Sequence, residues 1–253
     1  MRGSGPPLVL LHGFTQTGRL WGAFGRRVED AYTVVALDLP GHAGSDSIRA
    51  DLPTTANMVA DAVRAAIGDE PCVLLGYSLG ARVGLHVLTG TSLAVSRAVF
   101  IGLTGGIEDA AAREQRRSAD EKAAFALEAS GDLEGFLDRW LAGPLFARLS
   151  EGADRAERSR NSASGVASSL RLCGTGTQEP LWDRLPSMSI PVLALAGSDD
   201  TRFAAHALRV EEMAPNAVAS LVPGGGHALH LAQPEQSWRL IRHWLRADED
   251  GRQ

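Results

Sequence analysis

The sequence predicts an α/β fold in which a mostly parallel sheet is flanked by helices. Short apolar runs alternate along the chain with helical patterns, which is typical of parallel sheets joined by helical crossovers. The runs are rich in Val, Leu and Ile and lack polar alternation, as strands buried on both faces do. The 253 residues are enough to bury a full core, so we expect one domain with an insertion.

The individual elements follow from these two patterns. The apolar runs predict strands over residues 8–11, 33–37, 72–75, 98–101, 192–196 and 217–222. The helical patterns predict helices over residues 20–28, 55–67, 81–88, 204–213 and 235–246. The alternation stops once, after residue 103, where amphipathic stretches over 109–127, 133–141 and 166–173 follow one another without a strand. We therefore expect a helical cap over 104–190, inserted into a core formed by 1–103 and 191–253.

Composition excludes several classes of function. A formal net charge of -5, with 22% charged and 44% hydrophobic residues, gives no electrostatic footprint for nucleic acid. No apolar run is long enough for membrane insertion, and the start of the chain lacks the apolar region of a signal peptide, so a cytoplasmic location is expected. Cys72 and Cys173 are far apart, without metal-ligand spacing, which predicts buried thiols. We expect no metal, no organic cofactor and a monomer or weak homo-oligomer.

The string Gly76-Tyr77-Ser78-Leu79-Gly80 lies between a predicted strand and a predicted helix. Strand, Gly-x-Ser-x-Gly and helix form the nucleophile elbow, a sharp turn whose crowding excludes neighbouring β-carbons and raises the serine Oγ above the sheet edge. The amide of Leu79 then lies at a helix N-terminus, where backbone donors stabilise a developing negative charge. The sequence predicts a reactive Ser78 with Leu79 as one oxyanion donor.

A reactive serine needs a base and an orienting acid, and these are expected at the carboxyl ends of later strands. His227 follows the run 217–222 and a string of three glycines, and Asp199 and Asp200 follow the run 192–196. Ser78, an aspartate and His227 then occur in the chain order of an α/β-hydrolase triad. His230 is the competing base, although it has no glycine-rich approach. The residues alone leave Asp199 and Asp200 open, with Asp200 favoured as the later residue, and either could be a helix N-cap.

The second oxyanion donor is expected in the loop after the first strand. That strand is followed by His12-Gly13-Phe14-Thr15, in which the glycine allows the chain to turn back over the elbow. The amide of Phe14 is therefore the predicted partner of the Leu79 amide. His12, and His42 in the turn-forming string 38–42, are interpreted as structural hydrogen-bonding residues.

Together these elements resemble the α/β-hydrolase superfamily from residue 12 to residue 238. Within it, the chain resembles the MenH family, the 2-succinyl-6-hydroxy-2,4-cyclohexadiene-1-carboxylate synthases of menaquinone biosynthesis. The matching strings occupy residues 11–15, 38–42, 76–82, 140, 144–146, 160–161, 165 and 172–185. The last groups lie in the expected cap, where hydrolases diverge most. The family's Gly-x-x-Asp-x-basic-Phe string matches residues 197–203, and this match selects Asp200 as the catalytic acid.

The resemblance implies a carbon–oxygen lyase. Members of the family eliminate pyruvate from 2-succinyl-5-enolpyruvyl-6-hydroxy-3-cyclohexene-1-carboxylate, using the triad serine as a base. Such a small-molecule polycarboxylate requires fixed cations, and arginine binds carboxylates bidentately. Arg82 lies one helical turn after Ser78 and can face the site. By resemblance, the substrate pocket also contains Tyr77, Arg116, Trp140 and Arg160.

Two other classes of function share this framework. The first is a serine hydrolase, either a carboxylesterase or a hydrolase of C–C bonds in ring-cleavage products, which would use the same triad with water. The second is a non-catalytic receptor that binds a small molecule under the cap. Loss of activity on replacing Ser78 separates both enzymes from the receptor, and release of pyruvate separates the lyase from the hydrolase.

Overall fold

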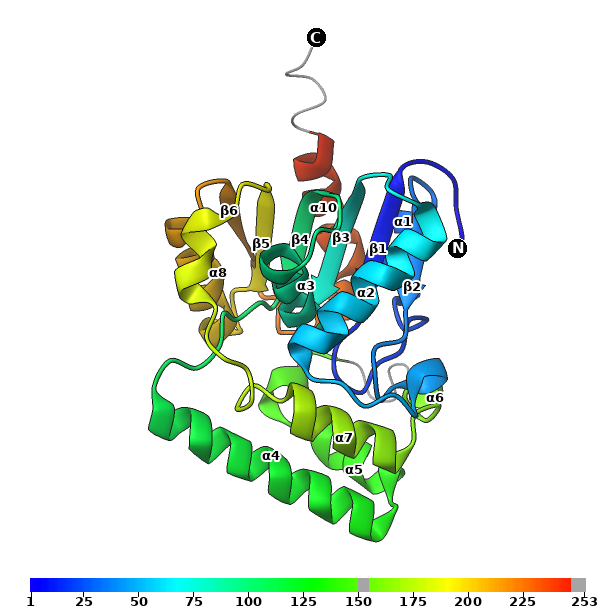
Figure 1. The fold of residues 1–253 in the computed structure, drawn as a ribbon, viewed down its shortest axis with the longest axis vertical. Helices are drawn as coiled ribbons and strands as arrows, with labels where there is room; N and C mark the ends of the chain where they lie inside the picture. The colour runs from blue at the N-terminus through cyan, green and yellow to red at the C-terminus, as the bar shows by residue number, and fades with distance from the viewer. Residues whose placement is uncertain (150–154, 247–253) are drawn as a thin grey trace.

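The computed structural model describes residues 1–149 and 155–246 and is built around a parallel sheet (Figure 1). Its six strands have the order β2-β1-β3-β4-β5-β6, and all neighbouring strands run parallel. The predicted fold class is therefore confirmed. The strands are β1 (Pro7–Leu11), β2 (Thr33–Leu37), β3 (Cys72–Tyr77), β4 (Val95–Ile101), β5 (Val192–Gly197) and β6 (Ala217–Val222).

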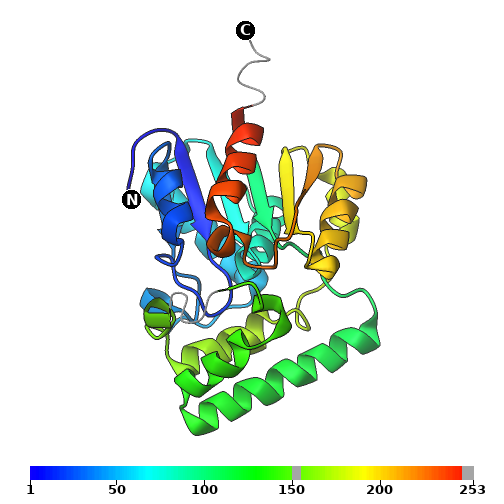
Figure 2. The ribbon, with the colours of Figure 1, turned by 180° about the vertical axis from the view of Figure 1, so that it is seen from behind.

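Helices cover both faces of the sheet (Figures 1 and 2). One face packs against α2 (Leu52–Ile67), α3 (Leu79–Gly90) and α8 (Thr201–Met213). The other packs against α1 (Gly22–Glu29), α9 (Leu229–Ala232) and α10 (Pro234–Arg246). Alternate residues of each strand point to opposite faces, so in β1 Val9 and Leu11 join the first apolar cluster and Leu8 and Leu10 join the second.

The edge strands differ from the expectation that every strand is buried on both faces. In β6, Val218 and Leu221 are 45% and 37% exposed, and in β2 Ala36 is exposed although Val34 and Val35 are buried. Both strands lie at the ends of the sheet, and Val218 and Leu221, three positions apart, point to opposite faces of it. The apolar composition of these two strands therefore reflects the β-propensity of their residues and does not indicate that both faces of the strand are buried.

Several helices begin earlier than predicted because caps determine their starts. The carboxylate of Asp51 accepts a hydrogen bond from the Thr54 amide and starts α2 at Leu52, with Pro53 in the first turn, where a missing amide hydrogen costs nothing. Similarly, α8 starts at Thr201, directly after its N-cap Asp200. The short α9 and α6 (Arg155–Arg158) were not predicted, because four residues carry no readable periodicity.

In the described part of the chain between β4 and β5, four α-helices are grouped at one end of the sheet (Figure 1). They are α4 (Ala110–Ser130), α5 (Leu133–Leu141), α6 and α7 (Ala163–Cys173). Residues of α4, α5 and α7 form a separate apolar cluster. The later 3-10 segment Trp182–Ser187 packs differently, since Trp182 and Leu185 belong to the main core. Across the described residues, no helix combines the length and apolar composition needed to cross a bilayer.

Trp182 anchors the end of this insertion to the core. Its indole is 1% exposed, donates to the Gly106 carbonyl at 2.9 Å and lies beneath the Arg209 guanidinium, 4.0 Å away. Trp182→Ala is expected to lower the free energy of unfolding by about 3–5 kcal/mol, because truncating a buried aromatic side chain leaves a cavity. Urea denaturation measures the change.

Phe125→Ala is the matched control, because its ring is 67% exposed on α4. This variant is expected to stay within about 0.5 kcal/mol of the unaltered protein. Equal denaturation midpoints for the two variants would show that Trp182 does not anchor the insertion.

Candidate active site

Ser78 occupies a strained turn between β3 and α3. Its φ is +51° and its ψ is -104°, a backbone conformation that residues with a side chain rarely adopt. A β-carbon at Gly80 would overlap the carbonyl oxygen of Leu11 at the end of β1. The second glycine of the motif therefore permits the elbow to lie directly against the neighbouring strand.

A continuous hydrogen-bonded chain joins Ser78, His227 and Asp200. The Nε2 atom of His227 lies 3.0 Å from the Oγ of Ser78, and its Nδ1 lies 2.8 Å from Oδ2 of Asp200. Since a carboxylate only accepts, Nδ1 carries the proton and Nε2 accepts from the serine hydroxyl. The side chains of His227 and Asp200 are 3% and 7% exposed, so the chain lies in a low-dielectric environment that strengthens it.

The structure distinguishes the two adjacent aspartates. Asp200 contacts His227 through Oδ2 and caps α8 through Oδ1, which accepts from the Phe203 amide at 3.5 Å. The sequence left open whether this aspartate contacts the histidine or caps a helix. One carboxylate does both, with a different oxygen for each contact. Asp199 points elsewhere and pairs with Arg148 at the surface.

Close packing sets the direction of the His227 ring. Gly102 has φ +65°, and a β-carbon there would lie 2.7 Å from Cε1 of His227, so this residue leaves room for the imidazole. Ring centroids of Phe203 and Tyr77 lie 4.3 and 5.3 Å from that of His227. The competing His230 packs on Tyr77 and lies 3.4 Å from Nε2 of Gln16. Burial lowers the pKa of His230 to about 3, which keeps it neutral.

The predicted oxyanion donors lie beside Ser78 in one cleft. Leu79 is the first residue of α3, and Phe14 lies in a turn closed by a 3.0 Å bond from the Gln16 amide to the Gly13 carbonyl. Both line the cleft together with Ser78 and His227. Within residues 1–149 and 155–246 the two amides donate to no protein acceptor, so both are available to an oxyanion.

The histidines near these donors have structural roles. His12 Nε2 accepts from the Leu39 amide at 2.9 Å, and His42 Nε2 accepts from the Thr15 amide at 3.3 Å. Burial lowers the pKa of His42 to about 4 and holds the pKa of His12 well below its ordinary value. Both imidazoles are therefore neutral acceptors that hold the loops after β1 and β2.

Arginines dominate the polar lining of the cleft. Arg82, from the first turns of α3, is 7% exposed and donates to Oε1 of Gln178 at 3.3 Å. Burial lowers its pKa to about 10, which leaves it charged at neutral pH. Arg116 of α4 also lines the cleft and donates to Asp120 at 2.8 Å. Trp140 of α5 forms an apolar wall, with its ring centroid 5.0 Å from that of Phe14.

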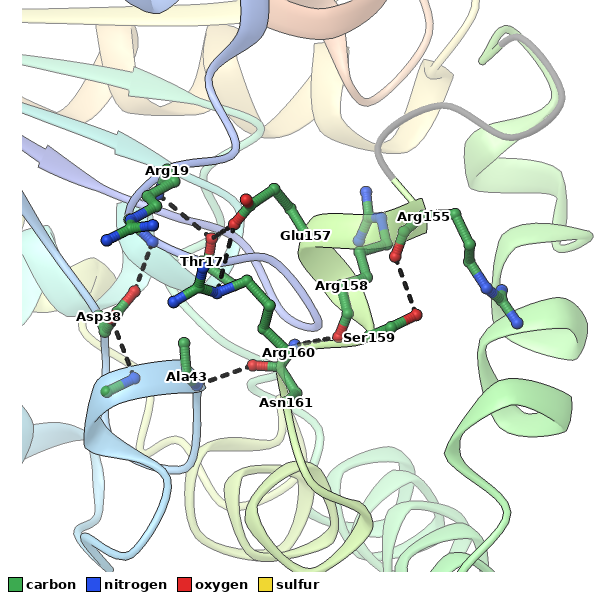
Figure 3. A network of polar contacts seen from close by, with 12 residues as sticks. Thr17, Arg19, Asp38, Ala43, Arg155, Glu157, Arg158, Ser159, Arg160 and Asn161 are labelled. Carbon is green, nitrogen blue, oxygen red and sulfur yellow. Dashed lines mark hydrogen bonds and ion pairs between the residues drawn. The ribbon is translucent and has the colours of Figure 1, made fainter.

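Two of the predicted substrate residues do not line this cleft. Tyr77 is 3% exposed and packs behind His227 and His230, on the opposite face of the sheet from α3. Arg160 follows α6, and its side chain is 44% exposed and lies 3.6 Å from Glu157 (Figure 3). Tyr77 therefore packs against His227, and the Arg160 side chain lies at the surface beside Glu157 of α6.

Sequence reasoning missed Arg202. This residue lines the cleft beside Phe203 and His227, two positions after the triad aspartate. It was visible as the basic residue of the 197–203 string, but it received no role. Among the described residues that line the cleft there are three arginines, Arg82, Arg116 and Arg202, and no carboxylate.

The described residues give no sign of a metal centre. No group of three or more His, Cys, Asp or Glu side chains among them is placed to hold a metal ion. Cys72 and Cys173 are buried and unpaired, and burial raises the pKa of both thiols to about 11. The prediction of buried thiols is confirmed.

Comparison with known proteins identifies the family. Residues 8–239 match the alpha/beta hydrolase family. The chain is 31% identical to a putative 2-succinyl-6-hydroxy-2,4-cyclohexadiene-1-carboxylate synthase of Bacillus subtilis, over 94% of this chain and 89% of that protein. The chain belongs to the MenH family. A second relative, the synthase of Serratia proteamaculans, is 31% identical over 95% of this chain and 93% of that protein.

Solved structures agree with this assignment. The structure of MenH from S. aureus superposes with a TM-score of 0.89 at 28% identity, covering 96% of this chain and 94% of that one. An E-2-(acetamidomethylene)succinate hydrolase superposes with a TM-score of 0.78 at 21% identity, covering 97% of this chain and 93% of that one, which shows the fold alone. The predicted resemblance to the MenH family is confirmed.

The geometry of the triad predicts unequal roles for the adjacent aspartates. Asp200→Asn is expected to lower kcat by about 10³- to 10⁴-fold, because an amide at this position favours the wrong tautomer of His227. The measurement is the steady-state rate of pyruvate release from the enolpyruvyl substrate that the MenH resemblance implies.

Asp199→Asn provides the control, since its carboxylate pairs with Arg148 at the surface. Its kcat is expected to remain within about twofold of the unaltered value, as exposed ion pairs contribute little. A larger loss for Asp199→Asn than for Asp200→Asn would contradict the assignment of the acid.

Proposed function

We propose that this protein is a lyase of menaquinone biosynthesis that eliminates pyruvate from 2-succinyl-5-enolpyruvyl-6-hydroxy-3-cyclohexene-1-carboxylate. The product is 2-succinyl-6-hydroxy-2,4-cyclohexadiene-1-carboxylate, the compound for which its relatives are named. The observation that carries the proposal is the Ser78–His227–Asp200 chain at a cleft lined by three arginines and, among the described residues, no carboxylate.

The substrate and product define which bonds change. The C2 hydrogen is removed, a C2=C3 double bond forms, the C3=C4 double bond moves to C4=C5, and the C5–O bond breaks. The enolpyruvate that leaves takes up a proton on carbon and becomes pyruvate. Electrons and atoms balance within the substrate, so the elimination requires a base and a proton donor and no external oxidant or reductant.

Ser78 is the proposed base. The ketone of the succinyl group on C2 makes the C2 hydrogen acidic, and the amides of Phe14 and Leu79 would bind the oxygen as negative charge develops on it. Ser78 Oγ takes the C2 proton while its own proton passes to Nε2 of His227, 3.0 Å away. Asp200 stabilises the resulting imidazolium, which then returns a proton to the leaving group.

The arginines match the charge of the substrate. The succinyl tail, the ring and the enolpyruvyl group each carry one carboxylate, and guanidinium groups bind carboxylates through paired hydrogen bonds. We assign substrate binding to Arg82, Arg116 and Arg202, with Trp140 as an apolar wall. Tyr77 is assigned to support of His227, and Arg160 to the surface of α6.

The same proposal covers the organisation of the chain. We divide it into a core over 1–103 and 191–253 and a cap over 104–190, because the cleft receives Ser78 and Arg82 from the core and Arg116 and Trp140 from the inserted helices. We place the reaction in the cytoplasm. We propose that the protein acts there as a monomer or weak homo-oligomer.

A coupled assay tests the proposed reaction. The unstable precursor is generated in the cuvette, and pyruvate release is followed together with the absorbance of the conjugated diene. The unaltered protein is expected to produce both in equal amounts, and Ser78→Ala is expected to lose most of the activity. Rapid hydrolysis of nitrophenyl esters without release of pyruvate would favour a serine hydrolase instead.

Arg82 is expected to bind a substrate carboxylate. Arg82→Ala should lower kcat/KM for pyruvate release by about 10²-fold, because the carboxylate loses a charge-assisted partner in a desolvated site. Arg82→Lys should recover only part of the loss, since an ammonium lacks the fork geometry. Thermal unfolding of both variants checks that the fold is intact.

Arg171→Ala is the matched control. This arginine of α7 pairs with Glu121 and Glu128 at the surface of the cap, and its loss should leave kcat/KM within about twofold. Unchanged kcat/KM in the Arg82 variants would remove Arg82 from the proposed site.

A further inference from the structure

The turn that carries the Phe14 amide is strained at the next residue. Thr15 has φ +66°, in the left-handed region that a β-branched residue rarely adopts. The turn is closed by the bond from the Gln16 amide to the Gly13 carbonyl, and glycine is preferred at the third position of turns with a positive φ there. Interactions outside the turn must therefore hold Thr15 in this conformation.

Each polar group of Thr15 has a partner. The amide donates to Nε2 of His42 at 3.3 Å, the carbonyl accepts from Nδ2 of Asn161 at 2.9 Å, and the hydroxyl accepts from Arg158. Asn161 and Arg158 both belong to residues 155–161, which comprise α6 and the turn after it and are called the α6 segment below. Two of these three hydrogen bonds of Thr15, which hold the turn that carries the Phe14 amide, thus come from residues outside the core.

Asn161 joins two strained loops through one side chain. Its Nδ2 donates to the carbonyls of Thr15 and Arg158, both at 2.9 Å, and its Oδ1 accepts from the amide of Ala43 at 2.9 Å. Ala43 also has a positive φ, +39°, and follows His42 directly. Asn161 is 6% exposed, and Figure 3 shows it reaching Ala43 from the α6 segment.

A separate contact docks the same segment on the core. Thr17 donates to Glu157 at 3.2 Å (Figure 3), and Thr17 lies three residues after Phe14. The α6 segment therefore contacts the loop after β1 at both Thr15 and Thr17. A change in the position of the α6 segment would therefore change the geometry of the loop after β1.

We propose that Asn161 is a positioning residue, whose side-chain amide fixes the Phe14 amide in the oxyanion hole when the α6 segment docks on the core. The proposal rests on the function proposed above. A carboxamide supplies a donor for the Thr15 carbonyl and an acceptor for the Ala43 amide at once. An aspartate retains only the acceptor and places a charged oxygen against the Thr15 carbonyl.

The consequence is a defect in turnover with little change in binding. The oxyanion contact strengthens only as charge develops, so its loss lowers kcat and leaves KM largely unchanged. A misplacement of about 1 Å lowers the rate by about 10²-fold. Asn161→Ala and Asn161→Asp are expected to lower kcat of pyruvate release about 10- to 100-fold, with KM within about threefold.

Ser159→Ala is the matched control in the same segment. Its hydroxyl is exposed and donates back to the Arg155 carbonyl of α6, so kcat and KM should remain within about twofold. All rates are measured well below the thermal midpoint of each variant. An Asn161→Ala variant with a lower midpoint but unchanged kcat would overturn the proposal, because Asn161 would then be merely structural.

Hydrogen exchange provides a readout that does not depend on the reaction. Mass spectrometry of a peptide covering residues 12–17 should show faster amide exchange in Asn161→Ala than in the unaltered protein or in Ser159→Ala. Loss of kcat without faster exchange would also overturn the proposal. If the unaltered protein releases no pyruvate, the proposed function fails, whereas an active unaltered protein with fully active Asn161 variants defeats only this inference.

Discussion

The close approach of the serine turn to the end of β1 is the constraint on which the site depends. Gly80 lies so near the Leu11 carbonyl that no side chain fits between them. This contact lets Ser78 keep a positive φ and brings the amide of Leu79 close to the loop that carries Phe14. One backbone contact thus places the proposed base and both proposed oxyanion donors, since each lies within a few residues of it.

The remaining members of the triad arrive through the parallel sheet. β3, β5 and β6 run parallel and end at the same edge, so Ser78, Asp200 and His227 converge although they are far apart in the chain. The helix cap at α8 orients Asp200 by occupying one carboxylate oxygen and leaving the other for His227. The helix that Asp200 caps therefore also holds the Asp200 carboxylate in position for His227.

The sequence predicts the fold, and also those site residues whose positions are set by strand ends. The position of Ser78 follows from the Gly-x-Ser-x-Gly motif, and that of His227 follows from its place after a later strand. Both can be predicted because the carboxyl ends of parallel strands lie at the same edge of the sheet. The direction of Asp200 against Asp199 depends on a few backbone dihedrals after β5, which composition does not encode. Arg160 illustrates the harder case, because α6 is only four residues long and its faces cannot be inferred from periodicity.

The cleft also shows why a negatively charged protein concentrates arginines at one point. Burial works against the charge on Arg82, and the neighbouring Arg116 lowers its pKa further, whereas Asp120 opposes this effect. Burial raises the pKa of Asp120 itself, and its carboxylate accepts a hydrogen bond from Arg116. In the part of the chain that the structure describes, the cleft lining contains three arginines and no carboxylate, so positive charge is in excess there. The three carboxylates of the proposed substrate would compensate this excess of positive charge, and binding would thereby offset the cost of burying the guanidinium groups.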